Sequence, residues 1–185
     1  PKVIDAIKNQ ADRYLHLMVY GEYIQTPQTL LAAKLATLLL ATLSSIYLVN
    51  SGSEAIEGAM KLTKRYTGRS EIIACKNSYH GSTHGALSIM GNETFKQAYR
   101  PLLPDIRFID FGEIIEIEKI STKTAAVFIE TIQGEAGIKI ANKAYWKALR
   151  AKCTETGTLL VLDEIQCGIG RSGKFSAFEH YDIVP

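Results

Sequence analysis

Continuous apolar runs alternate with helical stretches along this chain. Runs without polar alternation occupy residues 44–50, 70–76, 107–111, 124–130 and 158–164. Strands that are apolar on both faces are typical of parallel sheets with helices packed against both sides. The pattern therefore predicts an α/β fold with a mostly parallel, doubly wound sheet.

The stretches between these runs carry helix signals. Pro1 suits a first helical turn and is followed by apolar residues at helical spacing. After a predicted loop at 19–25, "VYGEYIQ", Thr26 reads as a cap and Pro27 as the first helical residue of a helix that runs to about Leu40. We expect residues 1–43 to form an N-terminal helical segment and residues 44–185 the main domain.

Two later helices have clearer boundaries. In "SGSEAIEGAMKLTKRYTG" an apolar face of Ile56, Ala59, Met60 and Thr63 precedes Gly68, which is a typical helix stop. Asn142 caps "KAYWKALRAKCTET", and Gly157 closes it. A short helix is predicted at 113–120, "EIIEIEKI".

Composition narrows the class of protein. The 185 residues carry a net charge of +2 and no dense Lys/Arg block, so nothing favours a nucleic-acid partner. Three cysteines lie far apart without a CxxC pair, which favours free thiols in a reducing, cytoplasmic compartment and no metal site. Residues 30–43 are apolar but interrupted by Lys34, so we expect a buried helix and no membrane partner.

The chain begins at Pro1 within a helical pattern and stops at "YDIVP". We therefore expect it to be incomplete.

The stretch "LLVLDEIQCGIGRSGK" at 159–174 matches two nucleotide motifs superficially. A dinucleotide-binding GxGxxG needs its first glycine at the strand end, yet five residues separate Leu162 from Gly168, and no helical stripe follows. A phosphate loop needs Ser or Thr after the lysine, where Phe175 stands. The glycines are predicted to form a turned loop, and a nucleotide-binding ATPase is the least favoured alternative.

The residues that follow each predicted strand carry the chemistry, because ligands of parallel sheets bind at the carboxyl ends of strands. "NSGSEA" places Ser51, Gly52 and Ser53 at a helix N-terminus, where free N–H groups bind anions, although Ser51 with Glu54 also has the spacing of a purely structural cap. Tyr79 in "SYHG" can stack on a planar ligand or be an ordinary core tyrosine.

Asp163 ends the last predicted strand. A buried carboxylate needs a partner, and a protonated ring nitrogen would be one; the alternative is that Asp163 only caps the following turn. Gln166 could donate to a ring hydroxyl. An anion-binding helix end, a stacking ring, a carboxylate and an amide donor together describe a site for pyridoxal 5′-phosphate (PLP).

With these motifs in hand, the sequence resembles the class III aminotransferases, above all their acetylornithine/ornithine branch. The resemblance rests on five segments in order: "VYGEYIQTPQ", "NSGSEAIEGAMKLTKRYTGR", "SYHGST", "ETIQGEAG" and "LLVLDEIQCGIGRSG". It implies the large domain, here incomplete, of a fold-type I PLP-dependent transferase. It also implies a cytoplasmic homodimer of arginine metabolism that transfers the terminal amino group of an ornithine-like donor to 2-oxoglutarate.

The resemblance further implies roles for single positions. Gly52 and Ser53 would bind the phosphate, Tyr79 would stack on the ring, Asp163 would pair with the ring nitrogen and Gln166 would contact the phenolic oxygen. Glu130 would support the site, and Glu135 would lie on the substrate side. His80 would either orient the site or be a structural histidine.

Two departures from the family pattern bear on activity. Ser82 stands where acetylornithine enzymes usually carry an arginine that holds the substrate carboxylate. The lysine that binds the cofactor covalently is expected downstream of residue 185, since Lys174 is too close to Asp163. A catalytically silent PLP-binding homologue is therefore the main alternative.

Overall fold

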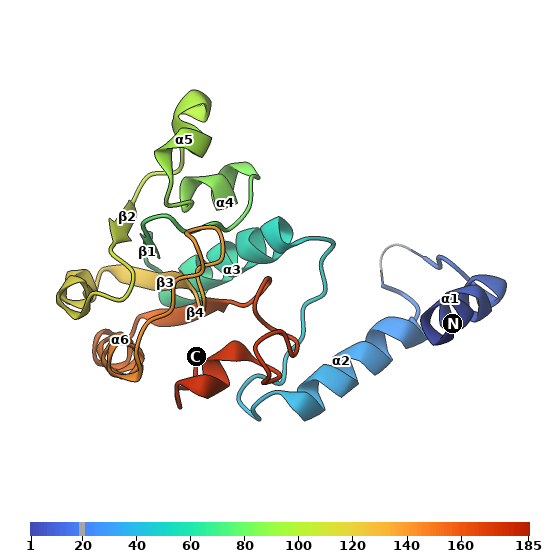
Figure 1. Ribbon diagram of the computed structural model, residues 1–185. Helices are drawn as coiled ribbons and strands as arrows, with labels where there is room; N and C mark the ends of the chain where they lie inside the picture. The colour runs from blue at the N-terminus through green and yellow to red at the C-terminus, as the bar shows by residue number, and fades with distance from the viewer. Residues whose placement is uncertain (19–20) are drawn as a thin grey trace. The chain divides into compact units, whose positions relative to one another are not determined.

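The computed structural model describes residues 1–18 and 21–185, which divide into two compact units, Pro1–Leu48 and Val49–Pro185 (Figure 1). The first unit contains α1 (Lys2–Arg13) and α2 (Thr26–Leu38). Of the predicted loop at 19–25, Val19 and Tyr20 lie outside the described residues.

Both helices of the first unit differ from the prediction in detail. Helix α2 begins at Thr26 with Gln25 as its cap, so Thr26 is the first helical residue and not the cap, and Pro27 lies in the first turn, where its missing N–H costs nothing. Neither α1 nor α2, each described throughout, contains a buried residue. The predicted burial of residues 30–43 is therefore wrong within this unit.

The predicted strand at 44–50 is also wrong. These residues form no strand and pair with none of the four described strands. An apolar run becomes a strand only when another strand satisfies its backbone groups, and the run itself cannot supply that partner.

The second unit contains a four-stranded parallel sheet in the order β2-β1-β3-β4. The strands are β1 (Glu71–Cys75), β2 (Ile106–Ile109), β3 (Thr124–Glu130) and β4 (Leu159–Asp163). All four lie within two residues of their predicted positions. Every residue of β3 is buried, because β3 lies between two strands and beneath helices on both faces.

The helices of this unit are α3 (Gly52–Thr67), α4 (His84–Ser88), α5 (Glu93–Lys96) and α6 (Lys143–Thr156), with 3₁₀ turns η1 (Gln97–Tyr99), η2 (Ile114–Lys119) and η3 (Ala177–His180). The predicted caps are present: Asn142 Oδ1 accepts the Tyr145 N–H at 2.9 Å. Gly68 and Gly157 end α3 and α6 in the left-handed conformation. The predicted short helix at 113–120 is the 3₁₀ turn η2.

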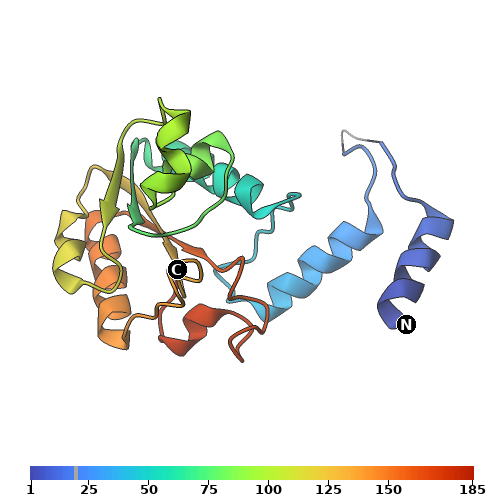
Figure 2. The ribbon, with the colours of Figure 1, turned by 45° about the horizontal axis from the view of Figure 1, so that its top comes forward.

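Helices cover both faces of the sheet (Figures 1 and 2). On one face Ile56 and Met60 of α3 and Ala86 of α4 pack against Ile72 and Phe128. Helix α6 and η2 lie on the other face, where Tyr145 and Trp146 are completely buried. The predicted doubly wound α/β architecture is confirmed, and it brings the carboxyl ends of all four strands to one edge of the sheet.

Candidate active site

A cavity of about 400 Å³ opens at the carboxyl edge of the sheet. Four segments line it: the N-terminus of α3, the loop after β1, the hairpin after β3 and the loop after β4. Nine of the ten residues expected at a functional site line it, namely Ser51, Gly52, Ser53, Tyr79, His80, Glu130, Glu135, Asp163 and Gln166. Ser82 is exposed and is not among the lining residues.

The N-terminus of α3 supplies free backbone donors to the cavity. Ser51 Oγ accepts the Glu54 N–H at 3.2 Å, and Glu54 Oε2 accepts the Asn50 N–H at 2.8 Å, so the structural cap suggested by the spacing is present. Gly52 and Ser53 follow Ser51 in the first turn and line the cavity. The helix has 16 residues, and its first N–H groups can bind an anion without removing the cap.

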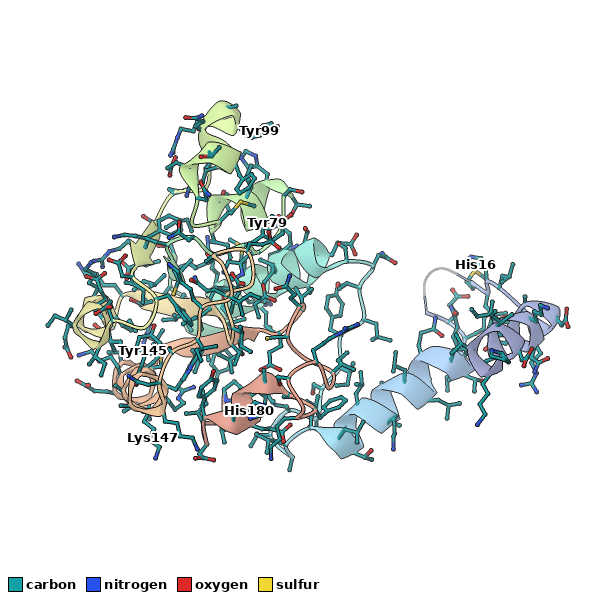
Figure 3. All side chains as sticks on the ribbon, viewed as in Figure 1. His16, Tyr79, Tyr99, Tyr145, Lys147 and His180 are labelled. Carbon is teal, nitrogen blue, oxygen red and sulfur yellow. The ribbon has the colours of Figure 1, made fainter. Side chains whose placement is uncertain are left out.

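Tyr79 lies on the loop after β1 (Figure 3). Its side chain is not a core residue, because 42% of its surface is exposed. The ring packs edge-on against Phe95 with 6.4 Å between centroids, which fixes its orientation, and its backbone N–H donates to Glu130 Oε1 at 2.7 Å. One ring is thus held at the cavity in a position to pack against a planar ligand.

Asp163 is 8% exposed at the end of β4 and lines the cavity. A histidine supplies a protein partner that the sequence pattern did not indicate: Oδ2 lies 2.8 Å from His80 Nδ1. Oδ1 accepts the Ile165 N–H at 3.1 Å, so Asp163 also caps the turn that follows it. Both interactions hold the carboxylate in place and leave it at the wall of the cavity.

His80 is 2% exposed. Its Nδ1 faces Asp163, and its Nε2 has no hydrogen-bond partner in the part of the chain that the structure describes. His80 contacts Asp163 and both residues line the cavity, so a role for His80 in orienting this carboxylate stays a prediction that the geometry allows.

Glu130, at the end of β3, is 6% exposed and joins two loops. Oε1 accepts the Tyr79 N–H, and Oε2 accepts the Gly134 N–H at 3.1 Å. Burial raises the pKa of Glu130, while these two N–H groups oppose the rise. The carboxylate thus connects the loop after β1 to the hairpin after β3, two of the segments that line the cavity.

Glu135 and Gln166 are both exposed at the cavity, and Gln166 Nε2 lies 3.5 Å from Glu135 Oε1. The contact is at the long limit of a hydrogen bond, so both polar groups remain available to a ligand. Lys174 is exposed and does not line the cavity.

Sequence reasoning missed four lining residues, Gly81, Ile132, Ile165 and Cys167. Each lies within two residues of a predicted site residue, and this adjacency was the available signal. Burial raises the pKa of the Cys167 thiol, so this cysteine is protonated at neutral pH.

Glu164 was missed as well, and it explains the glycine-rich loop. Its carboxylate accepts the N–H groups of Ala177 and Phe178 at 2.8 and 2.7 Å and the Thr131 hydroxyl at 2.9 Å. Residues 165–176 are thereby closed into a loop whose two ends meet at Glu164. The loop leads into a four-residue 3₁₀ turn and not into the helix of a dinucleotide fold.

The family model for aminotransferase class III matches residues 1–185, the whole chain. This chain belongs to the class III aminotransferases. Among its relatives in the family, the acetylornithine aminotransferase of Methanopyrus kandleri is 39% identical over 186 residues, covering 100% of this chain and 47% of that protein.

Another class III relative, the [LysW]-aminoadipate semialdehyde/glutamate semialdehyde transaminase of Sulfolobus acidocaldarius, is 48% identical over 138 residues, 75% of this chain and 36% of that protein. Among solved structures, the ornithine aminotransferase of Toxoplasma gondii, with partial occupancy of PLP at its active site, superposes with a TM-score of 0.86 at 29% identity. The match covers 99% of this chain and 45% of that one. The chain thus spans about half the length, or less, of these relatives.

In the described parts of the chain, no helix combines the length and the apolar character needed to cross a membrane.

Proposed function

We propose that the protein carries out PLP-dependent transamination, moving the terminal amino group of an ornithine-like donor, acetylornithine or ornithine, to 2-oxoglutarate. One observation carries the proposal: the buried carboxylate of Asp163 faces a cavity that the N-terminus of α3 and Tyr79 also line. A carboxylate, an anion-binding helix end and an aromatic ring at one cavity match the three parts of PLP, its ring nitrogen, its phosphate and its ring face.

The residues at the cavity fit this cofactor. The N–H groups of Gly52 and Ser53, next to Ser51, would hold the phosphate, favoured by the helix dipole by about 0.3–2 kcal/mol. Tyr79 would pack on the ring, and Gln166 would donate to the phenolic oxygen. When bound, PLP supplies an electron sink for the carbanion that transamination requires.

Asp163 would hold a proton on the ring nitrogen through a charge-assisted hydrogen bond, a contact of about 1.5–3 kcal/mol. His80 keeps this carboxylate aimed at the cavity by its 2.8 Å contact. Glu130 maintains the position of Tyr79 through the backbone N–H of that residue. These groups orient and polarise, whereas proton transfer to the substrate needs a further base, for which we propose the lysine expected downstream of residue 185.

The amino donor is proposed from the names of two relatives and from the residues exposed at the mouth of the cavity. Two of the proteins compared above are named for acetylornithine and ornithine, which supports a donor of that length and charge. Glu135 is exposed at the cavity, where it can contact the substrate. Ser82 cannot make the bidentate ion pair with a substrate carboxylate that an arginine makes, so we expect the donor carboxylate to be held by other residues. A cytoplasmic homodimer is part of the same proposal.

The test uses the full-length gene product. Addition of PLP should give a visible absorption band that borohydride reduction fixes covalently to the protein. With 2-oxoglutarate present, ornithine or acetylornithine should then yield glutamate, measured by chromatography. Absence of any PLP binding would overturn the proposal. PLP that binds but is never fixed by borohydride, together with no glutamate, would favour the silent homologue instead.

A further inference from the structure

The hairpin after β3 contains a glycine that its backbone does not explain. Gly134 follows Gln133, which pairs with Lys139 in an antiparallel bridge, and it donates its N–H to Glu130 Oε2. Its φ lies outside the range from +20° to +160° in which glycine is favoured. Residues with a side chain can adopt this conformation, so the reason for a glycine must be sought in the space around it.

That space is filled by Gln166. A Cβ atom on Gly134 would overlap the Oε1 atom of Gln166 and would lie only 2.6 Å from its Cδ and 3.1 Å from its Nε2. The amide group of Gln166 therefore rests directly against the Cα of Gly134. The two residues come from different loops, 32 positions apart in the sequence, and Gln166 lines the cavity.

We propose that Gly134 is a positioning residue that fixes the amide of Gln166 by leaving room for it. Gln166 is exposed, and its one side-chain hydrogen bond, to Glu135, is 3.5 Å long. Its amide would otherwise turn freely toward solvent, and a flexible donor makes a weaker contact because ordering it costs entropy. That this amide serves the phenolic oxygen of PLP rests on the proposed function; the packing itself does not.

The same hairpin also reaches the other side of the cavity. Glu130 accepts the backbone N–H groups of both Gly134 and Tyr79. One carboxylate therefore holds both the glycine against which the Gln166 amide packs and the residue that carries the aromatic ring. A residue larger than glycine at 134 would move the amide while leaving this pair of hydrogen bonds in place. The variant Gly134→Ala is thus a selective probe of the amide position.

The experiment compares Gly134→Ala, Gln166→Ala and the double variant in the full-length protein. Without cofactor, Gly134→Ala should unfold within about 2 °C of wild type, because the atom displaced ends a flexible, exposed side chain. A crystal structure of this cofactor-free variant should show the Gln166 amide turned away from residue 134. With PLP bound, the pH at which its visible band titrates should rise by about one pH unit, as in Gln166→Ala, because a donor to the phenolic oxygen is lost.

The double variant decides between positioning and general damage. If Gly134 acts through Gln166, the double variant should titrate like Gln166→Ala alone. Gly137→Ala is the matched control: it lies in the same hairpin at φ +92° with no atom within 4 Å of a new Cβ, so it should lower the melting temperature and leave the titration unchanged.

Two results would overturn the proposal: an amide still packed on residue 134 in the Gly134→Ala structure, or additive effects in the double variant. Failure of wild type to bind PLP would overturn the proposed function and not this inference, because the cofactor-free structure still reports where the amide lies.

Discussion

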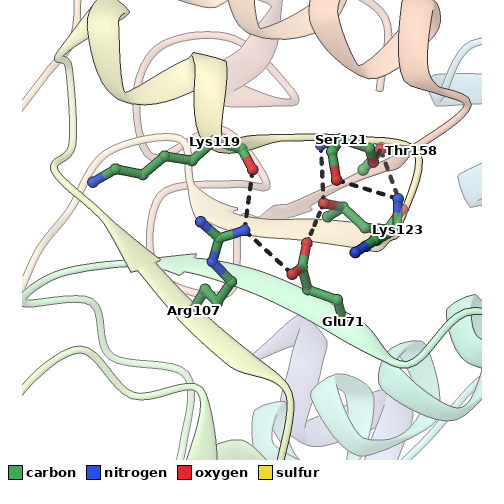
Figure 4. A network of polar contacts seen from close by, with 7 residues as sticks. Glu71, Arg107, Lys119, Ser121, Lys123 and Thr158 are labelled. Carbon is green, nitrogen blue, oxygen red and sulfur yellow. Dashed lines mark hydrogen bonds and ion pairs between the residues drawn. The ribbon is translucent and has the colours of Figure 1, made fainter.

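Polar side chains at the amino ends of the strands (the amino edge) and at their carboxyl ends (the carboxyl edge) differ in how fully the protein itself pairs them. At the amino edge, Glu71 accepts hydrogen bonds from the Thr124 hydroxyl at 2.5 Å and from Arg107 at 3.3 Å, and Arg107 also contacts the Lys119 carbonyl (Figure 4). Ser121 extends the network by donating its N–H to Thr124 Oγ1 at 3.2 Å. The groups of this edge satisfy one another, and the network ties together the starts of β1, β2 and β3.

At the carboxyl edge, the polar groups are held by hydrogen bonds but remain accessible from the cavity. Asp163 and Glu130 accept hydrogen bonds from neighbouring loops and still line the cavity, and His80 Nε2 has no partner among the described residues. Buried polar atoms left at a cavity wall are costly unless something else pairs with them. We therefore expect the amino edge to contribute mainly to stability, and the carboxyl edge to bind the proposed ligand.

The largest effect that separates the edges is expected for Asp163→Asn. Loss of the charge removes the ionic partner of the ring nitrogen, so the affinity for PLP should fall roughly 10- to 150-fold. His80 can still pair with the asparagine by changing tautomer, so the fold should persist. Titration by absorbance at fixed pH measures the affinity, and circular dichroism checks the fold.

Asp182→Asn is the control for the change in charge. Asp182 is exposed and pairs with Lys143 at 2.8 Å, away from the cavity-lining residues. Its affinity for PLP should equal that of wild type. If Asp163→Asn also stayed within about threefold of wild type, the assignment of this carboxylate to the ring nitrogen would be wrong.

The opposite outcome is expected at the amino edge. Glu71→Ala leaves the completely buried Thr124 hydroxyl without its acceptor and should lower the free energy of unfolding by about 1–3 kcal/mol. PLP affinity should not change. Denaturant unfolding measures the first quantity, and Glu118→Ala, which removes the exposed partner of a surface ion pair with Lys152, should have a far smaller effect. A fall in PLP affinity without a fall in stability would erase the contrast between the edges.

Glu130→Gln sharpens the contrast through pH. Burial raises the pKa of Glu130 above its ordinary value of 4.5, so over the interval above that value the folded protein binds a proton that the unfolded chain has released. The contribution of this residue to stability is therefore largest at low pH and decreases as pH rises through the interval. Glutamine cannot titrate, and it offers one acceptor to two N–H donors, so the variant should be less stable with a flatter pH profile.

Denaturant unfolding from pH 4 to 8 gives both profiles. Parallel profiles for wild type and Glu130→Gln would mean that Glu130 keeps its ordinary pKa. Burial at the carboxyl edge would then not disfavour the charged form of this carboxyl group.

Sequence patterns foresaw the elements better than their contacts. The strand at 124–130 and the helix ending at Gly157 agree with the structure because buried runs and caps are local signals. The strand predicted at 44–50 is absent because a strand also requires a neighbouring strand, which no local pattern reveals. The same limit applied to Thr26, whose role as a cap depends on the backbone of the residue before it.

The site shows the same limit. Asp163, Tyr79 and the turn at 51–53 could be placed together because each follows or precedes an element at one edge of a parallel sheet. The contact between His80 and Asp163 spans 83 positions and two strands that are not neighbours, so no spacing rule indicated it. The packing of Gly134 on Gln166 was hidden for the same reason.

The smallest effect is expected for an exposed ion pair at the carboxyl edge, which tests whether a charge there affects PLP affinity when it is not buried. Lys76 follows β1 and pairs with Asp110 at 2.8 Å, with 52% and 46% of the two side chains exposed, and neither residue lines the cavity. Asp110 raises the pKa of Lys76, so this contribution is fully present below about pH 10.5 and a measurement at neutral pH includes all of it. Exposed pairs contribute little and are screened by salt, so Lys76→Met should shift the melting temperature by less than about 2 °C, with the shift vanishing near 1 M NaCl. PLP affinity should stay within about twofold of wild type, whereas a large loss would show that unburied charges at this edge also act on the ligand, and burial would no longer distinguish the two edges.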